Sequence, residues 1–151
     1  MTNQELKDFI LTQVPDATIS EGKQYLTVEV PRDSLHKLAL ALRDSEQTAC
    51  DYLFCLSGVD MPNTIMVVYH LESTLHQHAL VLKTQTADRV NPELDTVSDI
   101  WQTAEFHERE VFDLLGIKFK NHPDLRRIFL DDTFGNPLRK DHVDEIRIVE
   151  R

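Results

Sequence analysis

The sequence predicts an α+β protein. We expect a two-layer sandwich in which a mixed or antiparallel sheet of four to five strands carries helices on one face, followed by an extended C-terminal tail. Three observations support this. Segments in which apolar residues recur at helical spacing are interspersed with segments in which apolar and polar residues alternate. The middle strands are separated by turns too short for a parallel crossover. The last part of the chain is broken up by proline and glycine. A chain of 151 residues with 41% hydrophobic residues is long enough for one domain with its own core.

The first third of the chain predicts two helices and two strands. A helix is expected over residues 3–14, where apolar residues recur at three- and four-residue spacings before Pro15. Two strands follow, over residues 18–21 and 25–30, and the second alternates apolar and polar residues. A proline then precedes a second amphipathic helix over residues 32–43.

Three further strands are expected in the middle of the chain. The segment 52–59 is nearly all apolar, which predicts a central strand, and the segment 64–71 is rich in β-branched and apolar residues. A third strand over residues 78–83 alternates less clearly. The breaks at 60–63 and 72–74 have turn composition, so the three strands should form a meander.

The last regular element is expected to be a helix. It begins at Thr96 or Ser98 and ends at Leu115, with Gly116 as its C-terminal stop, and a polar connector over residues 88–94 precedes it. Little regular structure is expected afterwards. The chain is therefore divided into a core domain and an extended docking tail of the same single domain, residues 1–116 and 117–151.

Charge and hydropathy exclude several classes of function. The formal net charge of −10 disfavours contact with nucleic acid or anionic lipid. No apolar stretch approaches the roughly 20 residues of a membrane span, and the start lacks the pattern of a signal peptide. In a bacterium this favours the cytoplasm or the cytoplasmic face of a membrane. The segment 117–140 is locally basic, which fits either a docking surface for an acidic protein patch or an internally paired loop.

No motif predicts a bound cofactor or metal. The two cysteines, Cys50 and Cys55, lie in an apolar run and are too few for an iron–sulfur cluster. His76 and His78 lack a supporting ligand pattern. The four glycines form neither a dinucleotide-binding loop nor a P-loop. We therefore expect no catalytic, cofactor-binding or metal-binding residue in this chain.

The last helix carries an acidic residue where the apolar pattern predicts a buried side chain. Glu108 falls on the apolar stripe that also contains Trp101, Ala104, Val111 and Leu115. A buried carboxylate needs a cation or strong donors, and Arg126 and Arg127 are candidates because the chain returns after Gly116.

Charged residues around Arg109 have two open interpretations. Glu105 and Asp113 each lie four residues from Arg109, so opposite charges are spaced for ion pairs. These are either surface pairs that stabilise the helix or part of a functional cluster. A hydrolase that uses Glu108 and Glu110 fits poorly, because residues two apart on a helix point in different directions.

The turn after the helix combines charge with conformational restriction. Pro123 fixes its own φ and restricts His122 to extended conformations. His122 is expected to be held in the turn by its hydrogen bonds rather than to act as a proton carrier. The neighbouring Arg126 and Arg127 can point to opposite faces, one inward to a carboxylate and one outward to a partner.

These residues together resemble the signature of a known family, the C-type subunit of bacterial NADH:quinone oxidoreductase (respiratory complex I). This is the family of the mitochondrial iron–sulfur protein 3 and of the chloroplast J-type subunit. The matching run covers residues 108–128, and a downstream match covers 135–141. His142 stands where the family often has proline. The signature and interface residues that the resemblance implies are Glu108, Arg109, Glu110, Asp113, Gly116, Phe119, His122, Pro123, Asp124, Leu125, Arg126, Arg127, Arg139 and Lys140.

The resemblance implies a peripheral scaffold subunit that has no catalytic activity of its own. Such a chain supports the quinone-reducing module of a proton-translocating electron-transport enzyme, on the cytoplasmic side of the bacterial inner membrane. Its partners would be the D-type and B-type subunits and other peripheral-arm subunits, with membrane contact only through the complex. NADH, FMN, iron–sulfur clusters and quinone would belong to neighbouring subunits.

Two alternatives stay open at the level of sequence. The chain is also compatible with the small subunit of a related membrane-bound NiFe hydrogenase or formate hydrogenlyase complex. A stand-alone acidic protein-binding module is the other alternative, and it predicts a tail packed on its own body. Membership of a larger assembly predicts a tail that is mobile in isolation.

Overall fold

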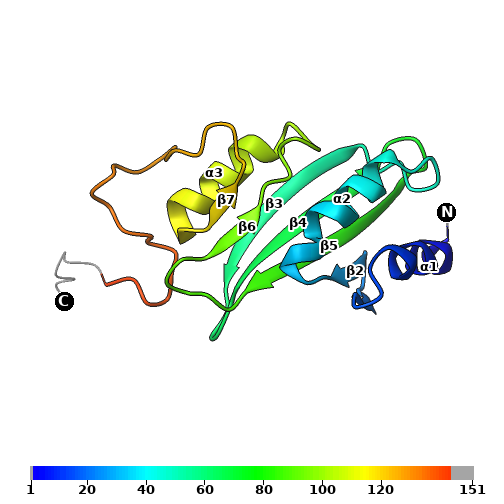
Figure 1. Cartoon of the computed structure of the whole chain (residues 1–151), viewed down its shortest axis with the longest axis horizontal. Coiled ribbons are helices and arrows are strands. Elements are labelled where there is room, and N and C mark those ends of the chain that lie inside the picture. The colour runs from blue at the N-terminus through cyan, green and yellow to red at the C-terminus, as the bar shows by residue number, and fades with distance from the viewer. Residues whose placement is uncertain (1, 144–151) are drawn as a thin grey trace.

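The computed structural model describes residues 2–143 (Figure 1). Helices and strands follow one another in the predicted order, with two additional short strands, one before and one after the last helix. The elements are α1 (Asn3–Gln13), β1 (Thr18–Glu21), β2 (Leu26–Glu29), the 3-10 turn η1 (Arg32–Ser34), α2 (Leu35–Asp44), β3 (Tyr52–Asp60), β4 (Ile65–Ser73), β5 (His78–Thr86), β6 (Glu93–Asp95), α3 (Ala104–Leu115) and β7 (Lys118–Lys120).

The main sheet has five strands in the order β1-β2-β5-β4-β3. The pairing of β2 with β5 is parallel and the other three pairings are antiparallel, which confirms the predicted mixed sheet. The prediction that residues 52–59 form a central strand is wrong, because β3 lies at an edge. Its apolar character comes from packing against α3, since Gly58 of β3 lies against Leu115 and Val111 of that helix.

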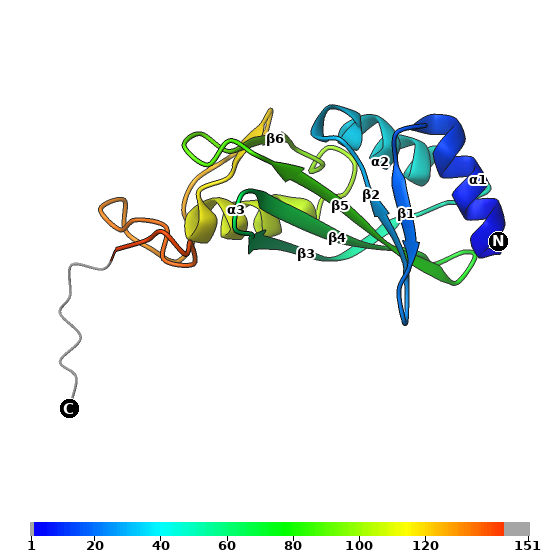
Figure 2. The ribbon, with the colours of Figure 1, turned by 90° about the horizontal axis from the view of Figure 1, so that it is seen from below.

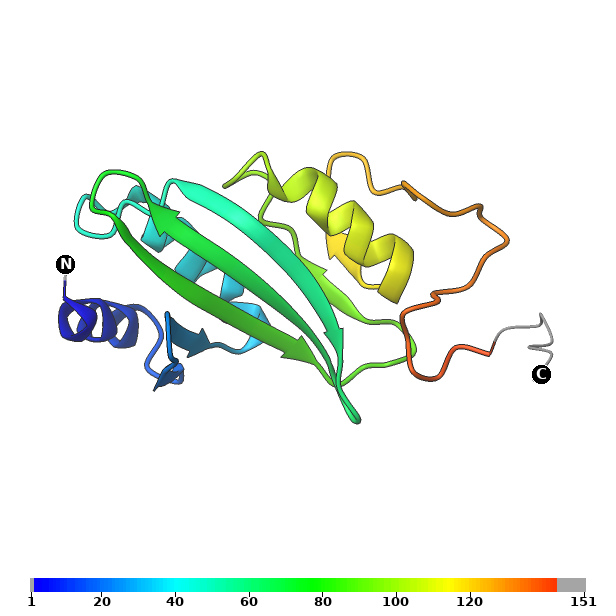
Figure 3. The ribbon, with the colours of Figure 1, turned by 180° about the vertical axis from the view of Figure 1, so that it is seen from behind.

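The helices cover one face of the sheet, as predicted. Alternate residues of β4 are buried on that face, namely Ile65, Val67, Tyr69 and Leu71. Figure 2 shows α1 and α2 together on one side of the strands. In the view from behind, no helix crosses in front of β3, β4 and β5 (Figure 3). The core therefore lies between a single sheet and its helical layer.

The predicted start of the last helix is wrong. α3 begins at Ala104, and the residues from Val97 to Thr103 form turns instead. The amides of Ile100 and Trp101 both donate to the carbonyl of Val97, at 3.0 and 2.9 Å. The Trp101 indole N–H donates to the carbonyl of Cys50 at 2.9 Å. Trp101 therefore anchors a turn to the core, a role that helical spacing alone does not distinguish from a helix position.

A small second sheet lies outside the prediction. β6 overlaps the end of the predicted connector, and β7 falls within the segment expected to lack regular structure. They pair in parallel, with Glu93 opposite Lys118 and Leu94 opposite Phe119. Strands of three residues are too short to show a period, so the sequence pattern does not reveal them. This sheet fixes the exit of the chain from α3.

Gly58 sets the distance between α3 and the sheet. A Cβ added to this glycine would overlap Leu115 Cδ1 and lie 3.0 Å from Val111 Cγ1. Gly58→Ala is therefore expected to lower the free energy of unfolding by about 1–3 kcal/mol through overpacking. Urea unfolding of the variant checks this, with Ser57→Ala at the exposed neighbouring position as the control. Equal stability of Gly58→Ala and wild type would contradict the close packing.

Candidate functional site

The candidate site is the C-terminal arm, residues 121–143, together with the face of α3 that holds it. Figure 1 shows this segment looping away from α3 and returning to the body. Its first attachment is the buried carboxylate of Asp113, which accepts hydrogen bonds from the amides of Ile128, Phe129 and Leu130 at 3.1, 2.7 and 3.2 Å. Arg127 Nη1 adds an ion pair at 3.0 Å. One side chain of α3 therefore fixes four successive residues of the arm.

The ionisation of Asp113 is set by these contacts. Burial raises the pKa of Asp113, but the amides of Phe129, Ile128 and Leu130 and the Arg127 guanidinium outweigh it, so the pKa of the carboxyl group is lowered. Arg127 also donates to the carbonyls of Phe134 and Gly135, at 2.6 and 3.2 Å. This closes the loop from residue 127 to residue 135. The pair therefore organises the arm and keeps Asp113 charged at neutral pH.

Arg109 supports the arm through backbone oxygens. Its Nε donates to the carbonyl of Arg126 at 3.1 Å and its Nη2 donates to that of Arg127 at 3.3 Å. The predicted ion pairs of Arg109 with Glu105 and Asp113 do not form in residues 2–143. The side chain bends toward the arm, where unpaired carbonyls need donors, rather than along its own helix.

A second attachment caps the end of α3. Asn136 Nδ2 donates to the carbonyl of Asp113 at 3.1 Å, and the amide of Leu138 donates to the carbonyl of Leu114 at 3.1 Å. The helix ends at Gly116, whose φ of 78° is the left-handed conformation expected of a C-terminal glycine. The arm thereby satisfies carbonyls that the last turn of a helix leaves unpaired.

A third attachment joins the arm to the hairpin of β3 and β4. Asp60 accepts two hydrogen bonds from Arg89, at 2.6 and 3.1 Å, and one from the amide of Lys140 at 2.7 Å. The Arg89 hydrogen bond is the largest cause of the lowered pKa of Asp60. Arg139 completes the attachment with an ion pair to Asp141 at 2.8 Å and a hydrogen bond to the carbonyl of Arg89 at 2.7 Å.

Glu108 is fully buried, as its place on the apolar stripe predicts, but its partners differ from those expected. It accepts hydrogen bonds from Thr96 Oγ1 at 2.5 Å and from the amide of Val97 at 2.8 Å. Arg126 and Arg127 do not reach it, because Arg127 is taken by Asp113 and Arg126 faces solvent with 69% of its side chain exposed. The nearest cationic candidate is His122, whose Nε2 lies 3.8 Å from Glu108 Oε2.

The environment of Glu108 favours its neutral form. Burial raises the pKa of Glu108, the hydrogen bonds from Thr96 and Val97 lower it, and the charge of Asp99 raises it again, with a result of about 7. A carboxyl group without a full counter-charge in the core is expected to behave in this way. Glu108 is therefore expected to change its charge near neutral pH.

His122 is held by the turn, as predicted. Its Nδ1 accepts a hydrogen bond from the amide of Asp124 at 3.0 Å, which requires an unprotonated Nδ1. The proton is then on Nε2, which lies 3.0 Å from the carbonyl of Glu105 and donates to it. The neutral ring links the arm to the first turn of α3.

The remaining signature residues divide between core and surface. Arg127 points inward to Asp113 and Arg126 points outward, where it pairs with Asp124 at 2.9 Å. The prediction that the two arginines face opposite ways is confirmed. Phe119 on β7 is buried and Leu125 packs against the core. The exposed members of the signature are Glu110, Pro123, Asp124, Arg126 and Lys140.

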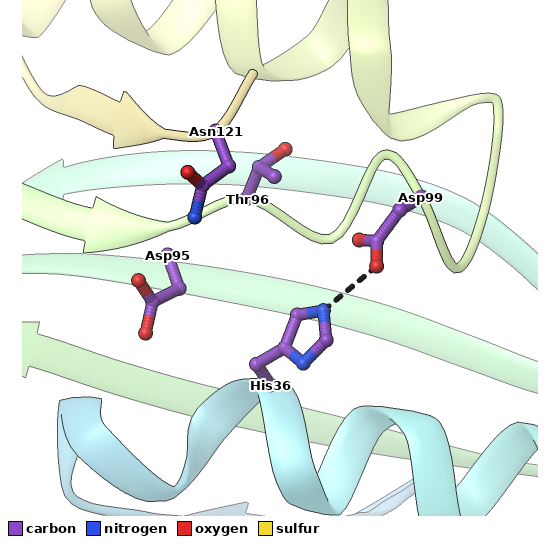
Figure 4. A pocket seen from close by; sticks show the side chains of 5 residues that line it. All are labelled: His36, Asp95, Thr96, Asp99 and Asn121. Atoms are coloured by element: carbon purple, nitrogen blue, oxygen red, sulfur yellow. Dashed lines mark hydrogen bonds and ion pairs between the residues drawn. The ribbon is translucent and has the colours of Figure 1, made fainter. Parts of the chain in front are cut away.

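A polar cavity of about 400 Å³ lies between α2 and the β6–β7 sheet. Figure 4 shows His36 and Asp99 joined across it by a hydrogen bond of 2.9 Å, with Asp95, Thr96 and Asn121 along the other side. Thr96 connects this cavity to Glu108. Within residues 2–143 no cluster of three or more His, Cys, Asp or Glu side chains is arranged to hold a metal ion. None of the helices in this range is long and apolar enough to cross a membrane.

Comparison with known proteins gives consistent matches. The family described as "Respiratory-chain NADH dehydrogenase, 30 Kd subunit" matches residues 28–145. A Phocaeicola vulgatus protein, named as the combined C/D subunit of NADH-quinone oxidoreductase, is 49% identical over 117 residues, which cover 76% of this chain and 22% of that protein. The chain thus spans about a fifth of the length of that relative.

Shorter relatives match over most of their length. The Moorella thermoacetica protein, named as the C subunit of NADH-quinone oxidoreductase, is 41% identical over 130 residues, covering 84% of this chain and 86% of that protein. A chain in the solved structure of the membrane-bound sulfane sulfur reductase, described as an archaeal respiratory membrane complex, is similar with a TM-score of 0.69 and 25% identity. That match covers 86% of this chain and 78% of the other. The chain therefore belongs to the family of the 30 Kd subunit of respiratory-chain NADH dehydrogenase, the C-type subunit of complex I.

Proposed function

We propose that this chain is a peripheral scaffold subunit of a proton-translocating NADH:quinone oxidoreductase, with no catalytic role and no cofactor of its own. One observation carries the proposal. Two ionic groups of the signature bind the arm's own backbone: Asp113 accepts three successive amides, and Arg127 donates to two carbonyls. The hydrogen bonds of these side chains hold the arm in its conformation, so the side chains are not free to bind a substrate.

The arm is proposed as the docking surface for neighbouring subunits. Several of its large apolar side chains face outward, among them Phe129 with 64% and Leu138 with 60% exposed. Exposed apolar residues on an otherwise acidic protein favour burial against a partner. The Phocaeicola vulgatus relative is named for both the C and the D subunits in one chain, which supports the D-type subunit as a neighbour. The B-type subunit is proposed as the second partner.

The same proposal assigns location and cofactors. The chain would sit on the cytoplasmic side of the bacterial inner membrane and contact the membrane only through the complex. FMN, iron–sulfur clusters, NADH and quinone would be bound by other subunits. The names of the relatives favour this enzyme over the hydrogenase alternative. The arm's attachment to its own body also fits the stand-alone module, which makes recovery of partners the deciding experiment.

The proposal is tested by purifying a tagged chain from its native membranes in mild detergent and identifying its partners by mass spectrometry. We expect D-type and B-type subunits together with NADH-oxidising subunits. Recovery of a nickel–iron large subunit in their place would assign the chain to a hydrogenase complex. Recovery of the tagged chain alone would contradict the scaffold proposal.

Arg127→Ala is expected to weaken assembly without changing the chemistry of complexes that still form. The substitution leaves the buried carboxylate of Asp113 without its cation and frees the carbonyls of Phe134 and Gly135. Breaking one side of a buried pair costs about 3–5 kcal/mol. The yield of co-purified subunits should fall, while NADH:quinone activity per assembled complex stays at the wild-type level. Normal assembly with reduced turnover would contradict a structural role, and Arg126→Ala at the exposed neighbour serves as the control.

A further inference from the structure

One edge of the main sheet, strand β3, offers a second surface apart from the arm. β3 is nine residues long and, among residues 2–143, pairs only with β4. Between Phe54 and Val59 its backbone makes no hydrogen bond beyond that pairing within the described residues. Ser57 is exposed and Val59 is 40% exposed. A long edge strand of this kind is a template for another strand unless the protein blocks it.

A groove runs beside this edge. It has a volume of about 190 Å³ and is formed by β3 on one side, by α3 on the other and by Leu138 of the arm. Leu56, Val111, Leu114 and Leu115 give it an apolar floor. Gly58 lets α3 approach closely enough to form the wall. The arm therefore forms part of the wall of a groove that lies beside an edge strand.

One acidic residue stands at the rim of the groove without a counter-charge. Glu110 is exposed, and in residues 2–143 it makes no ion pair and no side-chain hydrogen bond. The other carboxylates on this part of α3 are satisfied, since Asp113 binds the arm and Glu108 binds Thr96 and Val97. The outer face of α3 thus presents the negative charge of Glu110 to the groove. No residue among those described forms an ion pair with it.

We propose that the edge of β3 and the adjoining groove bind an extended segment of a partner subunit. The segment would add as a strand to β3, place an apolar side chain in the groove and place a lysine or arginine beside Glu110. Main-chain pairing gives affinity in this mode of recognition, and side-chain pockets give specificity. Charge complementarity favours a basic segment, because the chain as a whole is acidic and Glu110 stands at the rim. The inference rests on the proposed function, since it names a contact within the assembled complex.

The contact can be identified by photo-crosslinking in the native complex. A benzophenone amino acid in place of Ser57 is placed at the exposed edge, and the crosslinked peptide is sequenced by mass spectrometry. We expect a peptide of another subunit in which an apolar residue neighbours a lysine or arginine. A crosslink to residues 144–151 of this chain, to a second copy, or to no protein in an intact complex would overturn the proposal.

Reversing the charge of Glu110 tests the groove contact separately from the scaffold proposal. Glu110→Lys is expected to reduce co-purified partner roughly tenfold at low salt, with a smaller effect of Glu110→Gln. Glu46→Lys makes the same charge change on an exposed loop away from the groove and should leave the yield unchanged. If wild type recovers its partners and Glu110→Lys does so equally well, the groove proposal fails while the scaffold proposal stands. If wild type recovers no partner, the scaffold proposal itself fails.

Discussion

Asp113→Ala is expected to release the arm from α3 and to lower the free energy of unfolding by about 3–5 kcal/mol. The substitution removes the acceptor of three arm amides. It also leaves the largely buried Arg127 guanidinium without its carboxylate partner. Unsatisfied buried donors are costly because they lose water without gaining a partner. Urea unfolding measures the loss, and limited proteolysis should locate new cleavage between residues 126 and 135.

The control for this prediction is Asp132→Ala, which removes a carboxylate from an exposed position of the same arm. It should leave both stability and the protease pattern unchanged. Asp113→Asn retains an acceptor oxygen but loses the charge that pairs with Arg127, so an intermediate loss of stability is expected. An Asp113→Ala variant with wild-type stability and an uncleaved arm would show that other contacts, such as those of Asn136 and Asp60, hold the arm alone.

Much of the fold can be predicted from the spacing of apolar residues and from the turn residues that separate the elements. The apolar and β-branched residues of 64–71 predict β4, and alternate residues of that strand are buried against the helices. The apolar run in 52–59 correctly predicts a strand but not its place, because burial by a helix and burial between strands leave the same composition. The pairing of β3 with β4 alone, among the described residues, reveals the edge. Sequence pattern therefore indicates elements more reliably than it indicates their neighbours.

The candidate site is predicted less completely, for a physical reason. Glu108 is recognisable because a charged residue interrupts an apolar stripe, and its burial is confirmed. Its partners are a hydroxyl and a backbone amide, Thr96 and Val97, which carry no charge pattern that a sequence displays. Asp60 and Arg89 are missed altogether, since they are 29 residues apart and only the folded meander of β3, β4 and β5 brings them together.

The three acidic groups that are buried among residues 2–143 bind backbone amides in the same way. Asp60, Glu108 and Asp113 each accept at least one backbone amide from a segment outside their own element. Such a carboxylate accepts hydrogen bonds from the backbone amides of an irregular segment. In a sheet or helix, backbone carbonyls would accept them instead. This explains how a stretch without regular secondary structure keeps a defined shape.

The stability of the chain is expected to depend on pH through Glu108. The pKa of this carboxyl group rises from an ordinary 4.5 to about 7 in the folded protein. The folded state therefore holds a proton that the unfolded state has lost, and stability must fall as pH rises from about 4.5 to about 7. The total change is about 3 kcal/mol, since each pH unit over that interval is worth about 1.4 kcal/mol.

Other groups act over neighbouring ranges. The lowered pKa values of Asp60 and Asp113 give stability that is present above about pH 4 and is lost on further acidification. Burial lowers the pKa of His70 and of His78, which makes stability rise with pH up to about 6.5, opposite in sign to the effect of Glu108. The wild-type profile is thus a sum of opposing slopes, and Glu108 has to be isolated by substitution.

Glu108→Gln isolates it, because the amide keeps an acceptor for the Val97 N–H but cannot ionise. The difference in unfolding free energy between the variant and wild type should change by about 3 kcal/mol in favour of the variant between pH 4.5 and pH 8. Urea unfolding at intervals of half a pH unit measures it, with Glu110→Gln as the matched exposed control. A difference that does not vary with pH would mean that Glu108 is already ionised in the folded protein at pH 4.5, held by the Thr96 hydroxyl and the Val97 amide.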